Sequence, residues 1–317
     1  MSADSSHIPL LRPFVGGRFI ETAQRRMLRA PYDQRELAQV CECGRSELES
    51  ALSAAESALS VTRALTTDKR AAILSTVAKS LATHKDRLAL AICDDAGKPI
   101  ADAQAEVSRA ILCFELAAAE ALTTSSEGQV LAMDLAPLGY GRTGIVRRFP
   151  IGPIAAVSPF NFPLNLAVHK LAPAMAAGCP IVLKPASQTP TVALLLAEII
   201  DQAGWSSGAL SVVPASRAAA DLLVTDDRCK LLTFTGSAQV GWDMKARAGK
   251  KKVTLELGGN AAVILDETVS ERDLDAMVPK LVYGAYSYSG QKCISIQRVY
   301  VVSSSGDSLY QSLCERL

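Results

Sequence analysis

From Ile151 onwards, short continuous apolar runs alternate with stretches of helical periodicity. The runs cover 151–158, 180–184, 209–213, 230–234 and 252–257, and helical stretches lie near 164–177, 190–203, 215–224 and 237–248. Apolar strands joined by helices of this length are typical of a parallel, doubly wound sheet of the α/β class. Such sheets bind ligands at the carboxyl ends of their strands. We therefore expect the functional residues directly after these runs.

The first part of the chain has a different pattern. Short extended pieces at 14–20, 27–30 and 37–42 precede a helical run, before which Ser46 and Glu49 match a capping box. Further helices are predicted from about 68, over 85–96 and over 101–122, with Gly97 ending the second of them. Residues 127–149 alternate around a turn rich in Gly and Pro, which predicts a β-hairpin that pairs with another subunit.

Composition excludes several classes of protein. At 317 residues and 49% hydrophobic, the chain can bury a large core in more than one domain. The 33 basic and 32 acidic residues leave a net charge of +1 without long charged runs, so no nucleic-acid partner is expected. No apolar run is long enough to span a membrane, and Asp4, His7 and Pro9 interrupt the place of a secretory signal.

Cysteine and histidine are too scattered for a metal centre. The eight Cys contain no C-x-x-C pair, and the three His form no H-E-x-x-H array. The sequence therefore predicts no metal and a reduced, cytoplasmic protein.

Two polar residues follow the first two strands. Asn161 lies in Ser158-Pro159-Phe160-Asn161-Phe162-Pro163, where its amide could donate to a developing oxyanion. The alternative is an Asx-turn or a helix cap. Lys184 follows the second strand and could bind ribose hydroxyls or phosphate, although a surface lysine is the common explanation.

The fourth and fifth strands also end in suggestive residues. Gly236 and Ser237 precede a helix whose N-terminus would favour pyrophosphate, but this motif alone is weak. Glu256 closes the fifth strand before Gly258-Gly259. A buried carboxylate there must be used or paired, and burial would raise its pKa towards that of a general base.

Cys293 stands in Gly290-Gln291-Lys292-Cys293, on a predicted loop before a β-rich run (294–302). Gly290 permits positive φ, and the adjacent ammonium of Lys292 favours the thiolate. A lone Cys is more often a small buried hydrophobe, so the local pattern leaves both interpretations open.

Five motifs occur together in this order: S-P-F-N-F-P, K-P-A-S, F-T-G-S, E-L-G-G and G-Q-K-C. Together they resemble the NAD(P)-dependent aldehyde dehydrogenase superfamily, from about Phe14 to the last residue. Gly97-Lys98-Pro99 and the following Glu106-Val107 fit the same pattern. The resemblance implies dinucleotide-binding segments at 1–126 and 150–257, an oligomerisation hairpin at 127–149 and the start of a catalytic domain at 258–317.

The resemblance also implies a role for each catalytic residue. Cys293 would attack the aldehyde to form a thiohemiacetal, whose oxyanion the Asn161 amide and the Cys293 N–H would hold. Hydride transfer to the nicotinamide would leave a thioester, and Glu256 would activate the water that hydrolyses it. Lys184 would contact the adenosine ribose and Ser237 the pyrophosphate. The full set of predicted cofactor contacts is Ser158, Pro159, Phe160, Lys184, Ala186, Ser187, Gly236, Ser237, Val240, Leu257 and Gly258.

Substrate contacts are predicted at Phe162, Lys292 and Ile294. Lys292 could attract the acid group of an aldehyde, or it could face solvent or the cofactor. Many NAD-preferring relatives carry a Glu three residues after the ribose-binding lysine, and here that residue is Ser187. A hydroxyl does not repel the 2′-phosphate of NADP, so we expect NADP or both cofactors rather than strict NAD. The alternative is that Ser187 caps the helix near Pro190.

Compared with the family pattern, the chain stops soon after the cysteine strand. We therefore expect a C-terminally truncated aldehyde dehydrogenase with doubtful activity by itself, and a homodimer or tetramer only at full length. One rival is a defective fragment that binds nucleotide or a partner without turnover. Another is a CoA-acylating relative, against which Glu256 argues because such relatives usually lack it.

Overall fold

The computed structural model describes residues 8–123, 128–302 and 307–316. They form two compact units, of which the first contains Met1–Thr235 and Gly241–Leu255 and the second Gly236–Val240 and Glu256–Leu317. The predictions that rest on Asp4, on His7 and on position 127 lie outside the described residues. Within the described ranges, no helix is long and apolar enough to cross a membrane.

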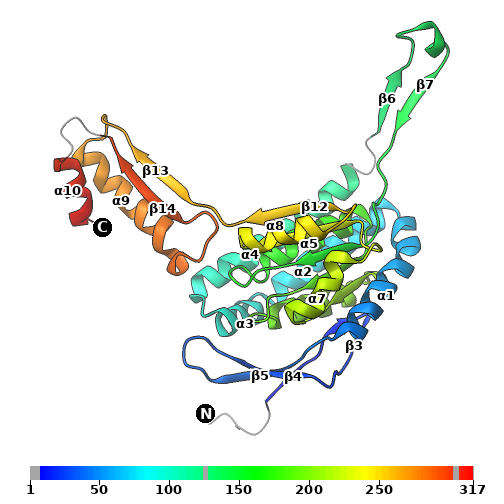
Figure 1. Ribbon diagram of the computed structural model, residues 1–317, viewed down its shortest axis with the longest axis horizontal. Coiled ribbons are helices and arrows are strands. Elements are labelled where there is room, and N and C mark those ends of the chain that lie inside the picture. Colours follow the sequence, from blue (N-terminus) through cyan, green and yellow to red (C-terminus); the bar gives the residue numbers. More distant parts are fainter. Residues whose placement is uncertain (1–7, 124–127, 303–306, 317) are drawn as a thin grey trace. The chain divides into compact units, whose positions relative to one another are not determined.

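The first unit is built on a seven-stranded sheet with the order β12-β11-β8-β9-β10-β2-β3. Figure 1 labels β12 and β3, the two ends of this order. Strands β11, β8, β9 and β10 pair with one another in parallel, and Ile181 pairs with both Ile154 and Leu210. This confirms the predicted parallel sheet, to which the N-terminal strands add an antiparallel edge. The strands are β2 (Phe14–Val15), β3 (Arg18–Phe19), β8 (Ile154–Val157), β9 (Ile181–Lys184), β10 (Leu210–Val212), β11 (Leu231–Gly236) and β12 (Lys252–Leu257).

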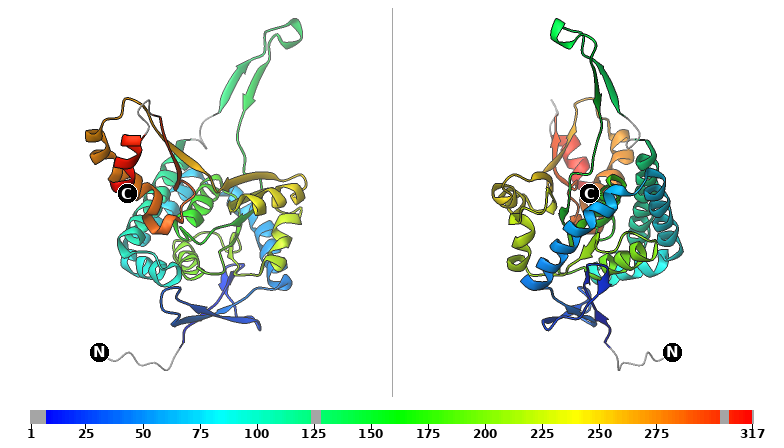
Figure 2. Two further views of the ribbon diagram at one scale, coloured as in Figure 1. Left: turned by 60° about the vertical axis from the view of Figure 1, so that its left-hand side comes forward. Right: turned by 90° about the vertical axis from the view of Figure 1, so that its right-hand side faces the viewer.

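Helices cover both faces of this sheet (Figure 2). Ile181 and Leu183 of β9 pack in a core with α2 to α6, whereas Val182 packs on the other face with α1 and α7. Strands buried on both faces explain the continuous apolar runs in the sequence. The helices are α1 (Arg45–Ala64), α2 (Thr67–Thr83), α3 (Lys85–Ala96), α4 (Ile100–Thr123), α5 (Asn165–Ala177), α6 (Thr191–Gln202), α7 (Arg217–Thr225) and α8 (Ala238–Arg247).

Helix ends agree with the sequence in one case and not in another. Helix α3 ends as predicted, because Gly97 adopts a left-handed conformation at φ 62°. The predicted capping box at Ser46 and Glu49 is wrong. Helix α1 starts after Gly44, whose N–H donates to the Glu47 carboxylate at 2.7 Å. A glutamate two residues earlier satisfies the helix terminus, so Ser46 lies inside the first turn.

Two smaller sheets accompany the large one. Strands β1 (Leu10–Leu11), β5 (Glu36–Cys41) and β4 (Arg25–Arg29) form a three-stranded sheet near the N-terminus. Strands β6 (Gln129–Ala132) and β7 (Thr143–Val146) form the predicted antiparallel hairpin, with a 3-10 turn η1 (Pro137–Gly139) between them (Figure 1). The hairpin exposes large apolar side chains, which include Val130, Leu135, Leu138 and Ile145.

The second unit contains a two-stranded parallel sheet of β13 (Ala261–Leu265) and β14 (Ile296–Val301). Helices α9 (Glu271–Tyr286) and α10 (Asp307–Arg316) contribute Leu274, Val278, Leu281 and Leu313 to a small core. A 3-10 turn, η2 (Ser287–Gly290), connects α9 to the cysteine loop.

Candidate functional site

Lys184 and Ser158 meet at the carboxyl ends of two adjacent strands in the first unit. The Ser158 N–H donates to the Lys184 carbonyl at 3.1 Å. Lys184 is only 8% exposed, so the surface-lysine alternative is wrong, and its ammonium donates to the Pro185 carbonyl at 2.9 Å. The pKa of Lys184 is lowered to about 8, first by burial and then by the charge of Arg217. An anion that binds beside this buried ammonium would stabilise its charged form, which burial disfavours.

The Ser158 hydroxyl is buried and has no hydrogen-bond partner within the described residues. Such a group costs free energy unless a ligand or water satisfies it. Pro159, Phe160 and Ala186 lie half-buried around the same strand ends.

Ser187 is exposed, and its carbonyl accepts from the Arg26 guanidinium at 2.6 Å. It does not cap the following helix. Helix α6 starts at Thr191, whose N–H and hydroxyl donate to the Asp95 carboxylate at 2.9 and 2.8 Å. The capping alternative for Ser187 is therefore wrong, because a carboxylate from α3 supplies that cap.

Asn161 and Phe162 form the turn between β8 and α5. The Phe162 N–H donates to Asn161 Oδ1 at 3.1 Å, which orients the side-chain amide. Asn161 is not a helix cap, since α5 begins at Asn165 after Leu164. The half-buried Phe162 ring lies beneath two cations, with Lys98 Nζ 3.8 Å and the Arg109 guanidinium carbon 5.8 Å from its centroid.

In the second unit, the segment after Glu256 runs beside the cysteine loop. A Cβ on Gly259 would lie 3.1 Å from the Cys293 carbonyl oxygen, so a residue without a side chain suits the close approach. Glu256 itself is exposed, and the expectation of a buried carboxylate is wrong. Strand β12 lies at the edge of its sheet and alternates half-buried and exposed residues, with Glu256 at an exposed position.

Cys293 lies on a turn before β14, as predicted, and the structure shows that it is exposed. Tyr288, Ser289 and Gly290 all have positive φ (52°, 54° and 69°), a conformation that non-glycine residues rarely adopt. The Lys292 ammonium has a protein partner as well as solvent, because Nζ donates to Ser287 Oγ at 2.6 Å.

Two further contacts connect the cysteine loop to α9. Lys292 Nζ also lies 4.8 Å from the centre of the Tyr283 ring. The buried Ser295 hydroxyl donates to the Ala285 carbonyl at 2.9 Å, which ties the loop to the end of α9. Ile294, the next predicted substrate contact, is exposed.

The remaining predicted cofactor contacts lie at the ends of β11 and β12 and in the first turn of α8. Gly236 ends β11 and Ser237 directly precedes α8, as the pyrophosphate prediction requires. Val240 and Leu257 are half-buried, and Gly258 is exposed. Contact of these five residues with a dinucleotide stays a prediction.

Sequence reasoning missed three buried polar arrangements in the first unit. Lys98 and Glu106 form an ion pair under the Asn161 turn. Asp95 caps α6, and Lys170 Nζ donates to the hydroxyls of Thr233 and Thr235. The available signal was a charged residue within an apolar helical pattern, which is typical of a paired buried group.

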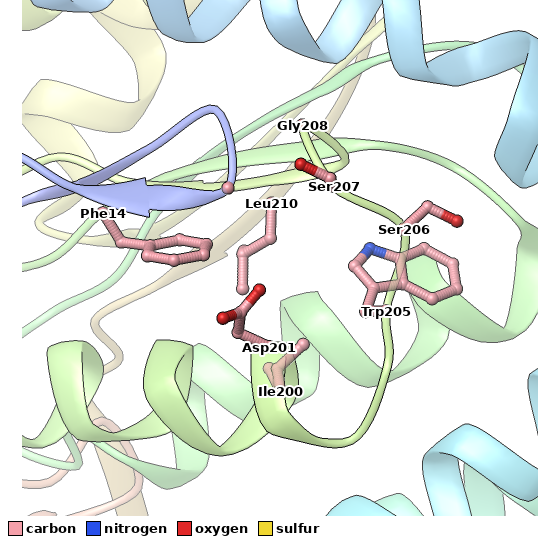
Figure 3. A pocket seen from close by; sticks show the side chains of 9 residues that line it. Phe14, Ile200, Asp201, Trp205, Ser206, Ser207, Gly208 and Leu210 are labelled. Atoms are coloured by element: carbon pink, nitrogen blue, oxygen red, sulfur yellow. The ribbon is translucent and has the colours of Figure 1, made fainter.

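A small hollow lies near the end of α6, where Phe14 and Leu210 face Trp205 and Asp201 (Figure 3). Its volume of about 10 Å³ holds about one water molecule. It is too small for a nucleotide or an aldehyde, and none of the predicted site residues lines it.

Comparison with known proteins identifies the family of the chain. The sequence model of the aldehyde dehydrogenase family matches residues 19–317. This chain belongs to the aldehyde dehydrogenase family.

Individual members of the family are similar over nearly the whole chain. The chain is 33% identical over 304 residues to the 3-sulfolactaldehyde dehydrogenase of Priestia aryabhattai, covering 96% of this chain and 62% of that protein. It is 37% identical to the NADP(+) succinate-semialdehyde dehydrogenase of Escherichia coli, covering 90% and 58%. The crystal structure of aldehyde dehydrogenase 21 from Physcomitrella patens, in complex with the reaction product succinate, has a TM-score of 0.91 and 41% identity, covering 98% and 63%. The chain thus spans somewhat less than two thirds of these relatives.

The strand ends of the first unit fit the nicotinamide dinucleotide that such dehydrogenases use. A buried cation and an unsatisfied hydroxyl on adjacent strands offer donors to ribose hydroxyls and phosphate. Arg26, beside Ser187, and Arg217, whose charge acts on Lys184, add positive charge there. The donor set therefore suits an anionic ligand, and it includes no carboxylate at position 187.

Proposed function

We propose that the protein containing this chain oxidises an aldehyde to a carboxylic acid with NADP or NAD. The observation that carries the proposal is the exposed Cys293 on a constrained turn, next to Gly259 in the segment that follows Glu256. The first unit and the Lys184 region would bind the dinucleotide, whose nicotinamide supplies a hydride acceptor. The second unit would supply the nucleophile.

The chain's own residues divide the reaction into two halves. The Cys293 thiolate adds to the carbonyl carbon, and the Asn161 amide and the Cys293 N–H donate to the oxyanion. Loss of hydride from that carbon leaves a thioester on Cys293. Glu256 then takes a proton from water, which attacks the thioester and releases the acid and the thiol. The exposure of Glu256 suits a base that must reach water.

We further propose that the aldehyde carries an acidic group. Two of the relatives are named for 3-sulfolactaldehyde and succinate semialdehyde, and both compounds are anionic at neutral pH. In this chain, Phe162 follows Asn161 directly, and the Arg109 guanidinium lies over its ring. Arg109 therefore offers a cation for such a group. Lys292, the other candidate, already donates to Ser287.

We propose that the hairpin β6–β7 mediates a homodimer or tetramer, because its exposed apolar side chains and open strand edges suit pairing with a second copy. Eight free thiols suit the reducing cytoplasm. No nucleic-acid or membrane partner is part of the proposal.

The test uses two proteins. One is the chain of residues 1–317, and the other is a chimera that joins this chain to the remaining part of the Escherichia coli succinate-semialdehyde dehydrogenase, which the chain does not cover. We expect the chimera to reduce NADP with succinic semialdehyde faster than with propanal. Glu256→Gln should leave a pre-steady-state burst of NADPH followed by slow turnover, because only the second half needs the base. Uniform loss of both phases would remove Glu256 from this role, and a folded chimera without oxidation of any aldehyde would reject the proposal.

One observation favours a second candidate, a chain that binds nucleotide without turnover. Ser158 and Lys184, which offer donors to a nucleotide, lie in the first unit, and this unit has its own core. Titration of NADP into residues 1–317, with binding but no aldehyde oxidation, would support this alternative for the isolated chain.

A further inference from the structure

A fully buried ion pair lies beneath the turn that carries Asn161. Lys98 Nζ contacts Glu106 Oε2 at 2.6 Å, and both side chains are 0% exposed. Lys98 follows α3, and Glu106 lies in the first part of α4. Neither residue belongs to β8 or α5, between which the turn runs.

Each member of the pair holds one end of the turn. Lys98 Nζ also donates to the Asn161 carbonyl at 2.5 Å. The second carboxylate oxygen of Glu106 accepts from the N–H groups of Leu164 and Asn165 at 2.9 and 3.0 Å. The pair therefore anchors the turn at its first residue and at its return into α5.

The same pair restrains the residue between these anchors. The Lys98 ammonium lies 3.8 Å from the centre of the Phe162 ring. The Phe162 N–H in turn fixes Asn161 Oδ1 at 3.1 Å. Because Oδ1 and Nδ2 share one rigid amide plane, this bond also sets the direction of the Nδ2 donor.

Stability alone explains this arrangement poorly. Taking two charges out of water costs free energy that their attraction returns only with good geometry and further hydrogen bonds. Burial raises the pKa of Glu106, while Lys98 and the two backbone donors act in the opposite direction. Apolar residues of similar volume often serve a core equally well. What apolar residues cannot do is bond the backbone at both ends of the turn, at the Asn161 carbonyl and at the N–H groups of Leu164 and Asn165.

We propose that Lys98 and Glu106 are positioning residues that fix the backbone of the Asn161 turn and so aim its amide at the oxyanion of the reacting aldehyde. The inference rests on the proposed function, because it gives Asn161 the role described above. It assigns to the pair no contact with substrate or cofactor.

The first experiment measures the turn itself in residues 1–317 by hydrogen–deuterium exchange. The double variant Lys98→Met/Glu106→Leu removes both charges together, so no unpaired buried charge remains. We expect the amides of Leu164 and Asn165 to exchange at least about tenfold faster. Lys98→Met/Glu106→Gln keeps an oxygen acceptor and should restore protection of those two amides. The matched control, Arg29→Met/Glu36→Leu, removes an exposed pair in the same unit and should change neither amide.

The second experiment separates positioning from structure in the chimera. Removing an oxyanion donor costs on the order of a hundred- to a thousandfold in rate, and a shift of about 1 Å costs about a hundredfold. We expect Lys98→Met/Glu106→Leu to lower kcat between about ten- and a hundredfold, with the aldehyde KM and the NADP Kd unchanged within about twofold. In an Asn161→Ala background, the same double variant should cause no further loss, because the amide that it aims is absent.

The outcomes are distinguishable. Unchanged exchange at Leu164 and Asn165, or an equal loss of kcat with and without Asn161, would overturn the proposal. A parent chimera that oxidises no aldehyde would instead count against the proposed function, and the exchange result would then decide whether the pair holds the turn. Circular dichroism of each variant excludes global unfolding as the cause.

Discussion

The two units of this chain differ in how many faces of their sheets are buried. In the first unit, helices cover both faces, and Ile181, Val182 and Leu183 of β9 are all fully buried. In the second unit, one face of β13 and β14 packs on α9 and α10, while Ile264 is 68% exposed and Tyr300 49% exposed. The first unit thus completes its core from its own residues. The second leaves an apolar face open, a surface type that usually marks an interaction site.

The largest expected effect separates the chemistry of one unit from ligand binding by the other. Cys293→Ala in the second unit should abolish aldehyde oxidation by the chimera, because no other group replaces the thiolate. NADP binding to residues 1–317 should persist, since Lys184 lies in the first unit. Aldehyde-dependent NADPH formation and a cofactor titration measure the two effects. Oxidation within tenfold of the parent would contradict the nucleophile assignment.

The second prediction tests the difference in burial directly. Leu183→Ala in β9 should lower the free energy of unfolding by about 2–5 kcal/mol, because it leaves a cavity in a closed core. Ile264→Ala in β13 should change it by less than about 0.5 kcal/mol, because the side chain is already in water. Urea denaturation of residues 1–317 measures both values. Similar losses would show that the exposed face of β13 is covered in solution.

The third prediction concerns a buried charge of the first unit. Burial raises the pKa of Asp95 from 3.8 to about 7, against the opposing hydrogen bonds from Thr191. The folded state then binds more protons than the unfolded state between these two values, so stability falls as pH rises through this window. The shift corresponds to at most about 4 kcal/mol.

Asp95→Asn should flatten this dependence, since an amide keeps an acceptor for the α6 terminus without titrating. Melting temperatures at pH values across the window provide the measurement. A control, Asp201→Asn, changes an exposed carboxylate at the other end of α6 that does not act on the pKa of Asp95, and should leave the pH dependence unchanged. Equal pH profiles for the parent and Asp95→Asn would place the titrating group elsewhere.

The smallest expected effect is on cofactor choice in the first unit. Ser187→Glu places a carboxylate near the predicted 2′-phosphate position, where it should repel NADP more than NAD. We expect the ratio of kcat/KM for NAD to kcat/KM for NADP to rise at least about tenfold in the chimera, which equals about 1.4 kcal/mol. Ser187→Gln, which has the same length without the charge, is the control. An unchanged ratio would place Ser187 outside the 2′-phosphate site.

Local patterns predicted those elements whose residues are neighbours in sequence. Continuous apolar runs identified β8 to β11, because strands buried on both faces need no alternation. Gly97 identified the end of α3, since its left-handed conformation depends on the residue alone. The capping box failed because Ser46 and Glu47 both suit a helix start, and only the fold selects which side chain reaches the free N–H.

The candidate site shows the same division. The sequence by itself identified Asn161, Lys184, Glu256 and Cys293 as candidate site residues, because their types and order resemble the motifs of the family. Only the tertiary structure decided that Lys184 is buried and Glu256 exposed, since burial depends on neighbouring strands and helices.

The arrangements that sequence reasoning missed join residues far apart in the chain. Asp95 reaches Thr191 across 96 positions, and Lys98 reaches Asn161 across 63. A periodic pattern reports which face of an element is apolar, but it contains no information on which distant backbone group a buried charge will meet. That choice is made when α3 and α4 pack against α5 and α6, because a buried charge is tolerated only where packing supplies its partners.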